Sequence, residues 1–258
     1  MKKLVLVASL FIFSFMIFAQ SLEKLKSFTY KWDDLTVKQT NSGEKRQIFE
    51  GYTNTLAYFE VHITTLKPGN APHESHFHSD MEEMIIVKEG LIAQTINERK
   101  KILGPGSVVL VLPGDQHGIS NAGDTDASYY IIRWRSKNPV DSNPDNNGGG
   151  SQFYNWIDIA AKTTEKGFHR QFMDRPTSLL DVLEMHVTTL QAGIASHGEH
   201  VHDAEEMVII TKGTVEESIN GSQQELGPGS LILLVDRVPH GVKNAGEGPC
   251  EYFAFRWE

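Results

Sequence analysis

The chain has almost no cysteine. Cys250 is the only one in 258 residues, so no disulfide can form within the chain. Stability must therefore come from a packed core, helped by metal if metal binds. Cys250 lies in an apolar segment near the end of the chain and has no partner thiol, which favours a small strand residue over a nucleophile.

The chain also has little positive charge. Its formal net charge is −9 at pH 7, and loss of the two positive charges of Lys2 and Lys3 would make it −11. Such a charge is unfavourable for binding to nucleic acid or to an anionic membrane surface. We therefore expect a small-molecule substrate and no nucleic acid as the partner, and a homodimer remains open.

Only one apolar run is long, the nearly continuous one over residues 4–18. It follows Lys2 and Lys3 and precedes the small residue Ala19, which is the pattern of a secretory signal peptide over residues 1–19. Its 15 residues fall short of the ~20 that span a bilayer, which disfavours the alternative of an uncleaved anchor. We expect a periplasmic or secreted protein with no membrane attachment after cleavage.

The rest of the chain lacks the long amphipathic periodicity of helices. Short runs of Val, Ile, Leu and Phe are broken by Gly, Pro and Asn, which favours an all-β fold. Residues 156–161 are compatible with a short helix or a strand. The expected strands cover residues 56–66, 83–88, 91–96, 107–112 and 127–134, and residues 179–190, 206–211, 214–219, 230–235 and 251–257.

An internal repeat dominates the chain. The sequence FEVHITTLKPG at residues 59–69 recurs as LEMHVTTLQAG at residues 183–193. The sequence LGPGS at residues 103–107 recurs at residues 226–230, and turn geometry explains its glycines, because no helix opens after them to form a phosphate cradle. The offset is 124 residues before the histidine cluster and 123 after it, so one turn residue is missing from the second copy.

The repeat divides the chain into two domains. Residues 136–152 are polar and contain Pro, Asn and three consecutive glycines, as in a flexible linker. We therefore expect an N-terminal domain over residues 20–135 and a C-terminal domain over residues 153–258. Several short antiparallel strands in each unit indicate a sandwich or a closed barrel.

Ten of the eleven histidines pair across the repeat, and only His169 lacks a counterpart. In the first copy His76 and His78 are two residues apart, so on a strand they would share one face. Glu83 follows after a turn, and His117 follows after another strand. Three neutral imidazoles and a carboxylate converging from neighbouring strands form a site for a first-row divalent ion and leave coordination positions free.

We expect one divalent ion in each domain, either Mn, Fe, Zn, Ni or Cu. A single His-x-His sequence would more often belong to surface or hydrogen-bonded histidines, but the same set occurs here twice at matching spacing. The neighbouring acids Glu82 and Glu205 should point to the opposite face of their strands. The candidate ligands are His76, His78, Glu83 and His117 in the first copy and His200, His202, Glu206 and His240 in the second.

These residues resemble the two-part signature of the cupin superfamily. A glycine, the His-x-His pair, a glutamate and a glycine stand in order over residues 69–90, and a glycine, a proline, a histidine and an asparagine over residues 106–121. Residues 193–213 and 229–244 match similarly. The resemblance is to a bicupin, and it implies two tandem double-stranded β-helix, jelly-roll-like barrels in which the eight candidate ligands hold the metals.

The copies depart from the signature without losing a ligand. Both have one extra residue between the opening glycine and the His-x-His pair. The second copy has three residues between His202 and Glu206, where the first has four between His78 and Glu83.

Other recurring residues are candidates for contact with substrate. His73 and His197 stand three residues before the first ligand, where they could contact substrate, act as an alternative ligand or be loop residues. Arg133 and Arg256 could clamp a substrate carboxylate if they point inward, or pair with an acid at the domain interface if they point outward.

Two further positions bear on the barrel interior. His62 and His186 could line the barrels or belong to a hydrogen-bonded polar outer face. Gln94 of the first copy is replaced by Glu217 in the second, so the two pockets could differ. No residue is assigned as catalytic from the sequence.

The implied functions are broad, because the family hosts isomerases, lyases acting on sugar acids, decarboxylases, dioxygenases, an aminohydrolase, storage proteins and sugar-sensing modules. Our leading hypothesis is an exported metal-dependent enzyme with isomerase or lyase-type chemistry on a small polar, oxygen-rich substrate such as a sugar-derived acid. The alternatives are a dioxygenase or decarboxylase of the same fold, or a non-catalytic metal-dependent ligand-binding protein.

Overall fold

A computed structural model describes residues 22–138 and 149–258. The predicted signal peptide and the centre of the predicted linker lie outside these ranges. Within them the chain is built from strands, with short 3-10 helices at η1 (Trp32–Asp34) and η3 (Trp156–Asp158). No helix in the described ranges has the length and apolar character to cross a membrane. The all-β prediction is confirmed.

The strands fall into two sets that follow the repeat. The first set is β1 (Phe28–Tyr30), β2 (Val37–Thr40), β3 (Gly43–Gly51), β4 (Leu56–Leu66), β5 (Glu82–Glu89), β6 (Ile92–Ile96), β7 (Arg99–Leu103), β8 (Val108–Val111), β9 (His117–Asn121) and β10 (Ala127–Ser136). The second set is β11 (Gln152–Tyr154), β12 (Lys162–Thr164), β13 (Gly167–Arg175), β14 (Leu183–Leu190), β15 (Glu205–Lys212), β16 (Val215–Ile219), β17 (Ser222–Leu226), β18 (Leu231–Leu234), β19 (His240–Asn244) and β20 (Cys250–Trp257).

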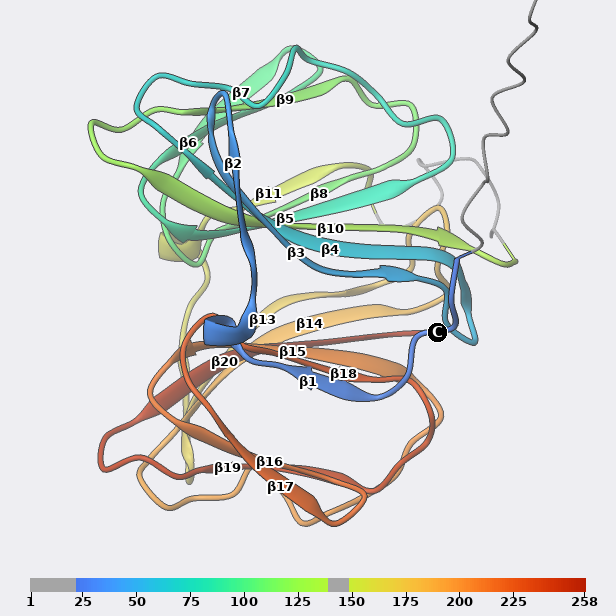
Figure 1. Cartoon of the computed structure of the whole chain (residues 1–258), viewed down its shortest axis with the longest axis vertical. Coiled ribbons are helices and arrows are strands. Elements are labelled where there is room, and N and C mark those ends of the chain that lie inside the picture. Colours follow the sequence, from blue (N-terminus) through green and yellow to red (C-terminus); the bar gives the residue numbers. More distant parts are fainter. Residues whose placement is uncertain (1–21, 139–148) are drawn as a thin grey trace, which may run out of the picture.

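Each set, apart from β1 and β11, forms one large and one small antiparallel sheet. The N-terminal barrel has the orders β11-β8-β5-β10-β4-β3-β2 and β7-β6-β9, and the C-terminal barrel has β1-β18-β15-β20-β14-β13-β12 and β17-β16-β19. Figure 1 shows the two small sheets at opposite ends of the molecule and the two large sheets facing each other in the middle. This is the expected architecture of two tandem double-stranded β-helix barrels.

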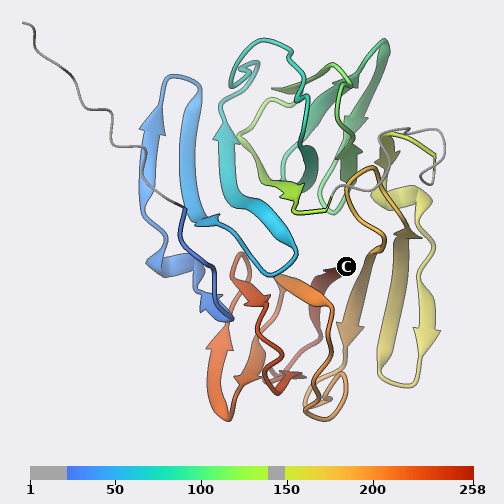
Figure 2. The same ribbon diagram turned by 90° about the vertical axis from the view of Figure 1, so that its right-hand side faces the viewer.

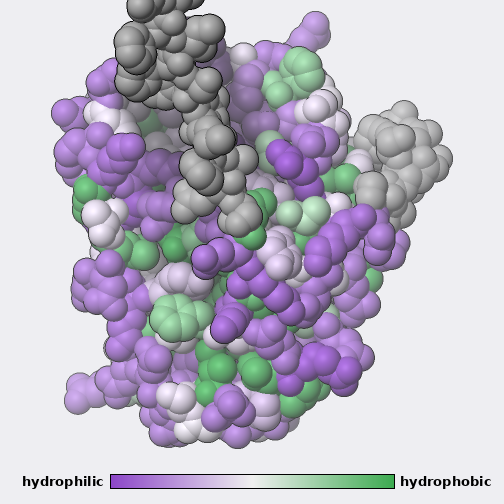
Figure 3. All heavy atoms as spheres, turned by 45° about the vertical axis from the view of Figure 1, so that its right-hand side comes forward, coloured by the Kyte–Doolittle hydropathy of each residue, from purple (hydrophilic) through white to green (hydrophobic). Residues whose placement is uncertain are grey.

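The alternation of side chains along each strand fills two kinds of core. On β10, Tyr129 and Ile131 point into the N-terminal barrel, whereas Tyr130, Ile132 and Trp134 pack between the two large sheets. The core between the sheets includes a contact of Phe59 with Trp257, whose ring centroids lie 5.1 Å apart. Figure 3 shows mainly hydrophilic side chains on one outer face, in keeping with apolar residues packed inside and between the barrels.

The two units exchange edge strands. β1 pairs with β18 of the C-terminal barrel, and β11 pairs with β8 of the N-terminal barrel. Figure 2 shows the segment that carries β1 running down beside the other barrel. The exchange covers two sheet edges that would otherwise present unpaired backbone groups. The domain boundaries stay a prediction from the repeat, and a strand of each unit crosses to the other barrel's sheet.

The exchanged segments each carry a tryptophan that packs on a glycine of the LGPGS turns. A Cβ atom on Gly106 would lie 2.5 Å from the Trp156 ring, and one on Gly229 would lie 2.6 Å from the Trp32 ring. Both glycines also have positive φ, at +82° and +93°. Turn geometry therefore explains only in part why glycine is needed at these two positions, because the close approach of the tryptophan ring also requires a residue without a side chain.

Several local expectations need correction. The predicted strand over residues 179–190 begins only at Leu183. For residues 156–161 a short helix and a strand are both compatible with the sequence, and residues 156–158 form the 3-10 helix η3. The His-x-His segment lies outside the named strands, and an isolated bridge joins His76 to His117. Polar edge strands such as β2 and β7 gave no apolar pattern to predict them, because solvent covers most of their side chains.

Candidate metal centres and their pockets

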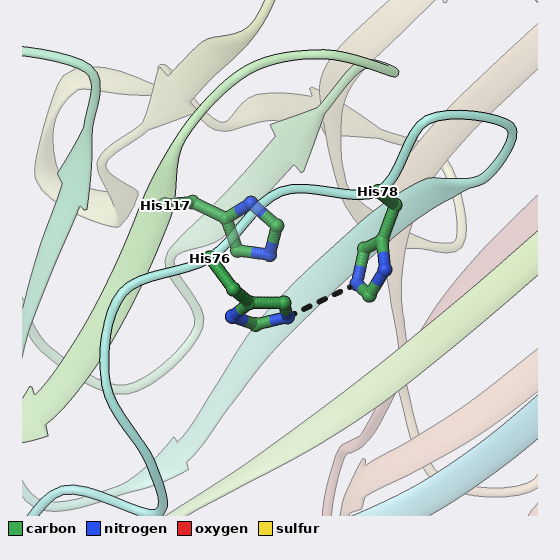
Figure 4. A group of neighbouring side chains, drawn as sticks. All are labelled: His76, His78 and His117. Carbon is green, nitrogen blue, oxygen red and sulfur yellow. Dashed lines mark hydrogen bonds between the residues drawn. The ribbon is translucent and has the colours of Figure 1, made fainter.

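Three histidines converge on one point of the N-terminal barrel (Figure 4). His76 and His78 come from the loop between β4 and β5, and His117 opens β9. Reciprocal backbone hydrogen bonds of 2.9 and 2.7 Å hold His76 beside His117. The Nε2 atoms of His76 and His78 lie 3.3 Å apart, and one ring nitrogen of each of the three lies within 4.8 Å of the others.

Glu83 completes this cluster from the beginning of β5. Its carboxylate oxygens lie 3.4 Å from His78 Nε2 and 3.5 Å from His117 Nε2. Burial opposes ionisation, but the imidazoles of His117 and His78 hold the pKa of the Glu83 carboxyl well below its usual range. Burial and the imidazoles of His117, His73 and His78 lower the pKa of His76 to about 4. The cluster therefore offers an anionic oxygen and a neutral imidazole at neutral pH.

The hydrogen bonds of His117 leave one ring nitrogen available. Its Nδ1 donates to the Asp115 carbonyl at 3.0 Å, which turns Nε2 toward the cluster. His240 repeats this arrangement, with Nδ1 2.9 Å from the Val238 carbonyl. Among the described residues neither Nε2 has a hydrogen-bond partner, although both are buried. Buried imidazoles fixed in this way fit a divalent metal ion.

The C-terminal barrel has the corresponding cluster. His200 and His240 exchange two backbone hydrogen bonds of 3.1 Å. Glu206 Oε2 lies 2.9 Å from His202 Nε2 and 3.7 Å from His240 Nε2. His202 Nδ1 donates to the Ala204 carbonyl at 2.7 Å, which turns its Nε2 to the cluster. The structure thus brings together each predicted set of three histidines and one glutamate, and their role as metal ligands stays a prediction.

Each cluster lies in the wall of a pocket. The N-terminal pocket has a volume of about 260 Å³, and its lining includes His62, Gln94 and Arg133. The C-terminal pocket is larger, at about 500 Å³, and its lining includes His186 and Arg256. His62 and His186 therefore line the barrels, which was one of their two predicted placements.

Both arginines point inward, but they are held differently. Arg133 stands opposite Glu60 and Glu83 on the neighbouring strands, so the three side chains share the inner face. Arg133 donates through Nε to Glu60 Oε2 at 2.8 Å and again through Nη2. In the C-terminal barrel, Arg256 Nε lies 3.8 Å from Glu184 Oε2. The Arg256 side chain is 53% exposed, against 25% for Arg133, so Arg256 is the arginine more available to a ligand.

Glu60 and Glu184 have a role that sequence reasoning did not assign. Glu60 lies 2.6 Å from His62 Nδ1 and accepts from Gln47 at 3.1 Å, and Glu184 lies 2.9 Å from His186 Nδ1. Both acids stand beside the pockets and orient an imidazole on the wall. The recurrence of Glu-x-His on β4 and β14 is the signal that could have revealed these pairs.

His73 and His197 lie at the pocket rims against the first histidine of each cluster. The ring centroids are 4.4 Å apart for His73 and His76, and 4.1 Å apart for His197 and His200. Both rim residues are exposed. This position is open to substrate and close to the cluster, and contact with substrate stays a prediction.

The inner position occupied by Gln94 in one barrel and Glu217 in the other is almost fully buried in both. Burial and the charge of Glu206 raise the pKa of Glu217 to about 9. Neither carboxyl oxygen of Glu217 has a hydrogen-bond partner among the described residues. At this inner position the two sites therefore differ by one ionisable group.

Glu82 and Glu205 point away from the clusters, as expected. Glu82 accepts from Trp134 Nε1 at 2.9 Å and from the backbone amide of Leu179 at 3.0 Å. Glu205 accepts from Trp257 Nε1 at 3.0 Å. These acids lie between the large sheets and join the two barrels.

Comparison with known proteins agrees with this architecture. The family described as "Cupin domain" matches residues 62–133 and 186–256, which together make up more than half of the chain. No curated protein matches significantly.

Solved structures share the fold over nearly the whole chain at low sequence identity. Protein Ylba from E. coli has a TM-score of 0.69 at 15% identity, covering 93% of this chain and 95% of that one. Oxalate decarboxylase from Lactobacillus farciminis, solved with formate, has a TM-score of 0.67 at 15% identity, with 92% and 87% covered. A putative glyoxylate induced protein from Pseudomonas aeruginosa has a TM-score of 0.66 at 17% identity, with 86% and 83% covered.

Proposed function

Because this chain belongs to the cupin family, with two cupin domains in tandem, we propose that it is a metal-dependent enzyme acting on a small, oxygen-rich acid. The observation that carries the proposal is the convergence of three histidines and one glutamate on the wall of a pocket, twice in one chain. A divalent ion held there would supply Lewis-acid polarisation of a carbonyl or carboxylate oxygen.

The C-terminal pocket supports an acidic substrate. Arg256 lies on the inner wall and is half exposed, so its guanidinium is placed to bind a carboxylate with two parallel hydrogen bonds. Lys166 and His169 line the same pocket, where each can donate a hydrogen bond to a bound acid. His197, at the rim, is placed to hold or move a proton on the bound substrate. Sugar-derived acids fit this combination of donors, and isomerase or lyase chemistry is the reaction class we propose.

Screening of metal-loaded protein tests the proposal. The purified chain is loaded separately with Mn, Fe, Zn, Ni and Cu, and turnover of sugar acids, oxalate and flavonols is followed by product analysis. We expect turnover of a carboxylate substrate with one metal and loss of that activity in His240→Ala or Glu206→Gln. Absence of turnover with every metal, in protein shown to bind metal, would contradict the proposal.

That negative result would favour a metal-dependent ligand-binding protein. Such a protein would bind an acid in the C-terminal pocket without product, and His240→Ala would change stability and binding alone. Product formation from oxalate or a flavonol would instead assign a decarboxylase or a dioxygenase.

We also propose that the protein is exported, on the basis of the pattern over residues 1–19. Expression of the full-length chain in its own cell type, followed by fractionation and N-terminal sequencing, checks this. The expected mature protein begins near Gln20. Uncleaved protein in the cytoplasm would contradict export and would leave the enzymatic proposal standing.

A further inference from the structure

The two metal centres differ most at one inner position. β6 carries Gln94 and β16 carries Glu217, and the two positions correspond in the repeat. Each is only 1% exposed. All eight predicted ligands are retained between the copies, so at the buried positions next to them this exchange of an amide for a carboxyl is the chemical difference between the centres.

The strand register places Glu217 on the face of the predicted ligands. Ile219 stands opposite His240, and Glu217 stands opposite Val242 on the same pair of strands. Residues two apart on a strand point to the same side, so Glu217 and His240 share the inner face of the barrel. They are diagonal neighbours, within reach of a long side chain.

The Glu217 carboxyl has no protein partner that would justify its burial. Both of its oxygens are buried without a hydrogen bond among the described residues. A buried carboxylate is strongly unfavourable unless a cation or hydrogen-bond donors compensate it. The charge that acts on it most is that of Glu206, a predicted metal ligand, which repels it. A divalent cation at the C-terminal cluster would replace this repulsion by attraction.

We propose, building on the metal-dependent function above, that Glu217 supplies a second carboxylate to the C-terminal centre and makes it the tighter of the two metal sites. The N-terminal centre has one carboxylate, Glu83, and the neutral amide of Gln94 at the matching place. Once a divalent ion has displaced the proton of Glu217, the C-terminal set of charges sums to zero, whereas the N-terminal set sums to one positive charge. An added negative charge inside a barrel acts through a low dielectric and is weakly screened by salt.

Metal titration of the full mature chain tests this inference. Isothermal titration with Mn²⁺ of the metal-free wild type should show two sites of unequal affinity. Glu217→Gln should weaken the tighter site by about tenfold to hundredfold, the range for groups that support metal ligands. Gln94→Glu should tighten the weaker site, and the double exchange should reverse the order of filling. Electron paramagnetic resonance of bound Mn²⁺ should change for the tighter site in Glu217→Gln.

Glu216→Gln is the matched control. Glu216 is adjacent but points to the other face of β16, so the same loss of charge there should leave both affinities unchanged. The metal-free melting temperature of Glu217→Gln should equal or exceed that of the wild type, since the variant removes an unpaired buried acid. An unchanged tighter site in folded Glu217→Gln would overturn this inference alone. Failure of the wild type to bind any divalent metal would overturn the proposed function as well.

Discussion

Glu82 of the N-terminal barrel accepts a hydrogen bond of 2.8 Å from the hydroxyl of Thr177, which belongs to the other repeat. Glu205 of the C-terminal barrel accepts a bond of 2.5 Å from Thr53 of the first repeat. Each acid directly precedes the predicted metal ligand of its own strand. The first residues of β5 and of β15 are therefore hydrogen-bonded to the opposite barrel on one face and carry the carboxylate of the predicted metal ligand on the other.

Loss of the Thr177 hydroxyl should destabilise the protein. Thr177→Val keeps the shape of the side chain and leaves a buried carboxylate with one donor fewer, which should cost about 1–3 kcal/mol of unfolding free energy. Thr53→Val should have a comparable effect through Glu205. Thr163→Val, at an exposed position of β12, is the control and should stay within about 0.5 kcal/mol. Urea denaturation measures all three, and equal values for Thr177→Val and Thr163→Val would contradict the assigned role.

Metal binding in one barrel should be lost without loss of metal binding in the other. Elemental analysis of protein loaded with one metal should give two ions per chain in the wild type and one in either His117→Ala or His240→Ala. Chelator should lower the melting temperature of the wild type, because binding to the folded state alone adds stability. A full complement of metal in both single variants would show that these histidines are not ligands.

Substitution of Arg133 should lower stability, whereas substitution of Arg256 should weaken ligand binding. Arg133→Gln leaves the buried Glu60 without its main cation and should cost about 3 kcal/mol. Arg256→Gln should change stability little, because that side chain is half exposed, but should weaken binding of a small carboxylate by about tenfold. Thermal unfolding and equilibrium binding to the metal-loaded protein measure the two effects. The reverse pattern would remove Arg256 from the proposed substrate site.

The contribution of Trp156 packing on the LGPGS turn to stability can be measured by comparing two glycine variants. Gly106 and Gly114 both have φ near +85°, at +82° and +87°, but only Gly106 lies against another residue, Trp156. Gly114→Ala should therefore cost about 1 kcal/mol for its backbone conformation alone. Gly106→Ala should cost at least about 2 kcal/mol more, since the exchanged segment must move away. Similar unfolding free energies for the two variants would mean that the tryptophan adapts without loss.

Much of the fold could be predicted from local patterns. The long strands β4 and β10 coincide closely with the predicted ones, because most of their side chains are buried and β-branched, aromatic or other apolar residues recur along them. Edge strands such as β2 escaped prediction because their exposed residues carry no such signal. The exchange of β1 and β11 between barrels also left no local trace, since backbone pairing does not depend on which partner strand is used.

The sequence by itself determined that two copies of one unit exist and that each carries three histidines and one glutamate at corresponding positions, because a repeat shows which residues recur. Only the tertiary structure decided how those residues are used. It paired Arg133 with Glu60 while leaving Arg256 exposed, and it buried Glu217 on the inner face shared with His240. Neighbours across a sheet are set by strand register and packing, and distance along the chain does not encode them.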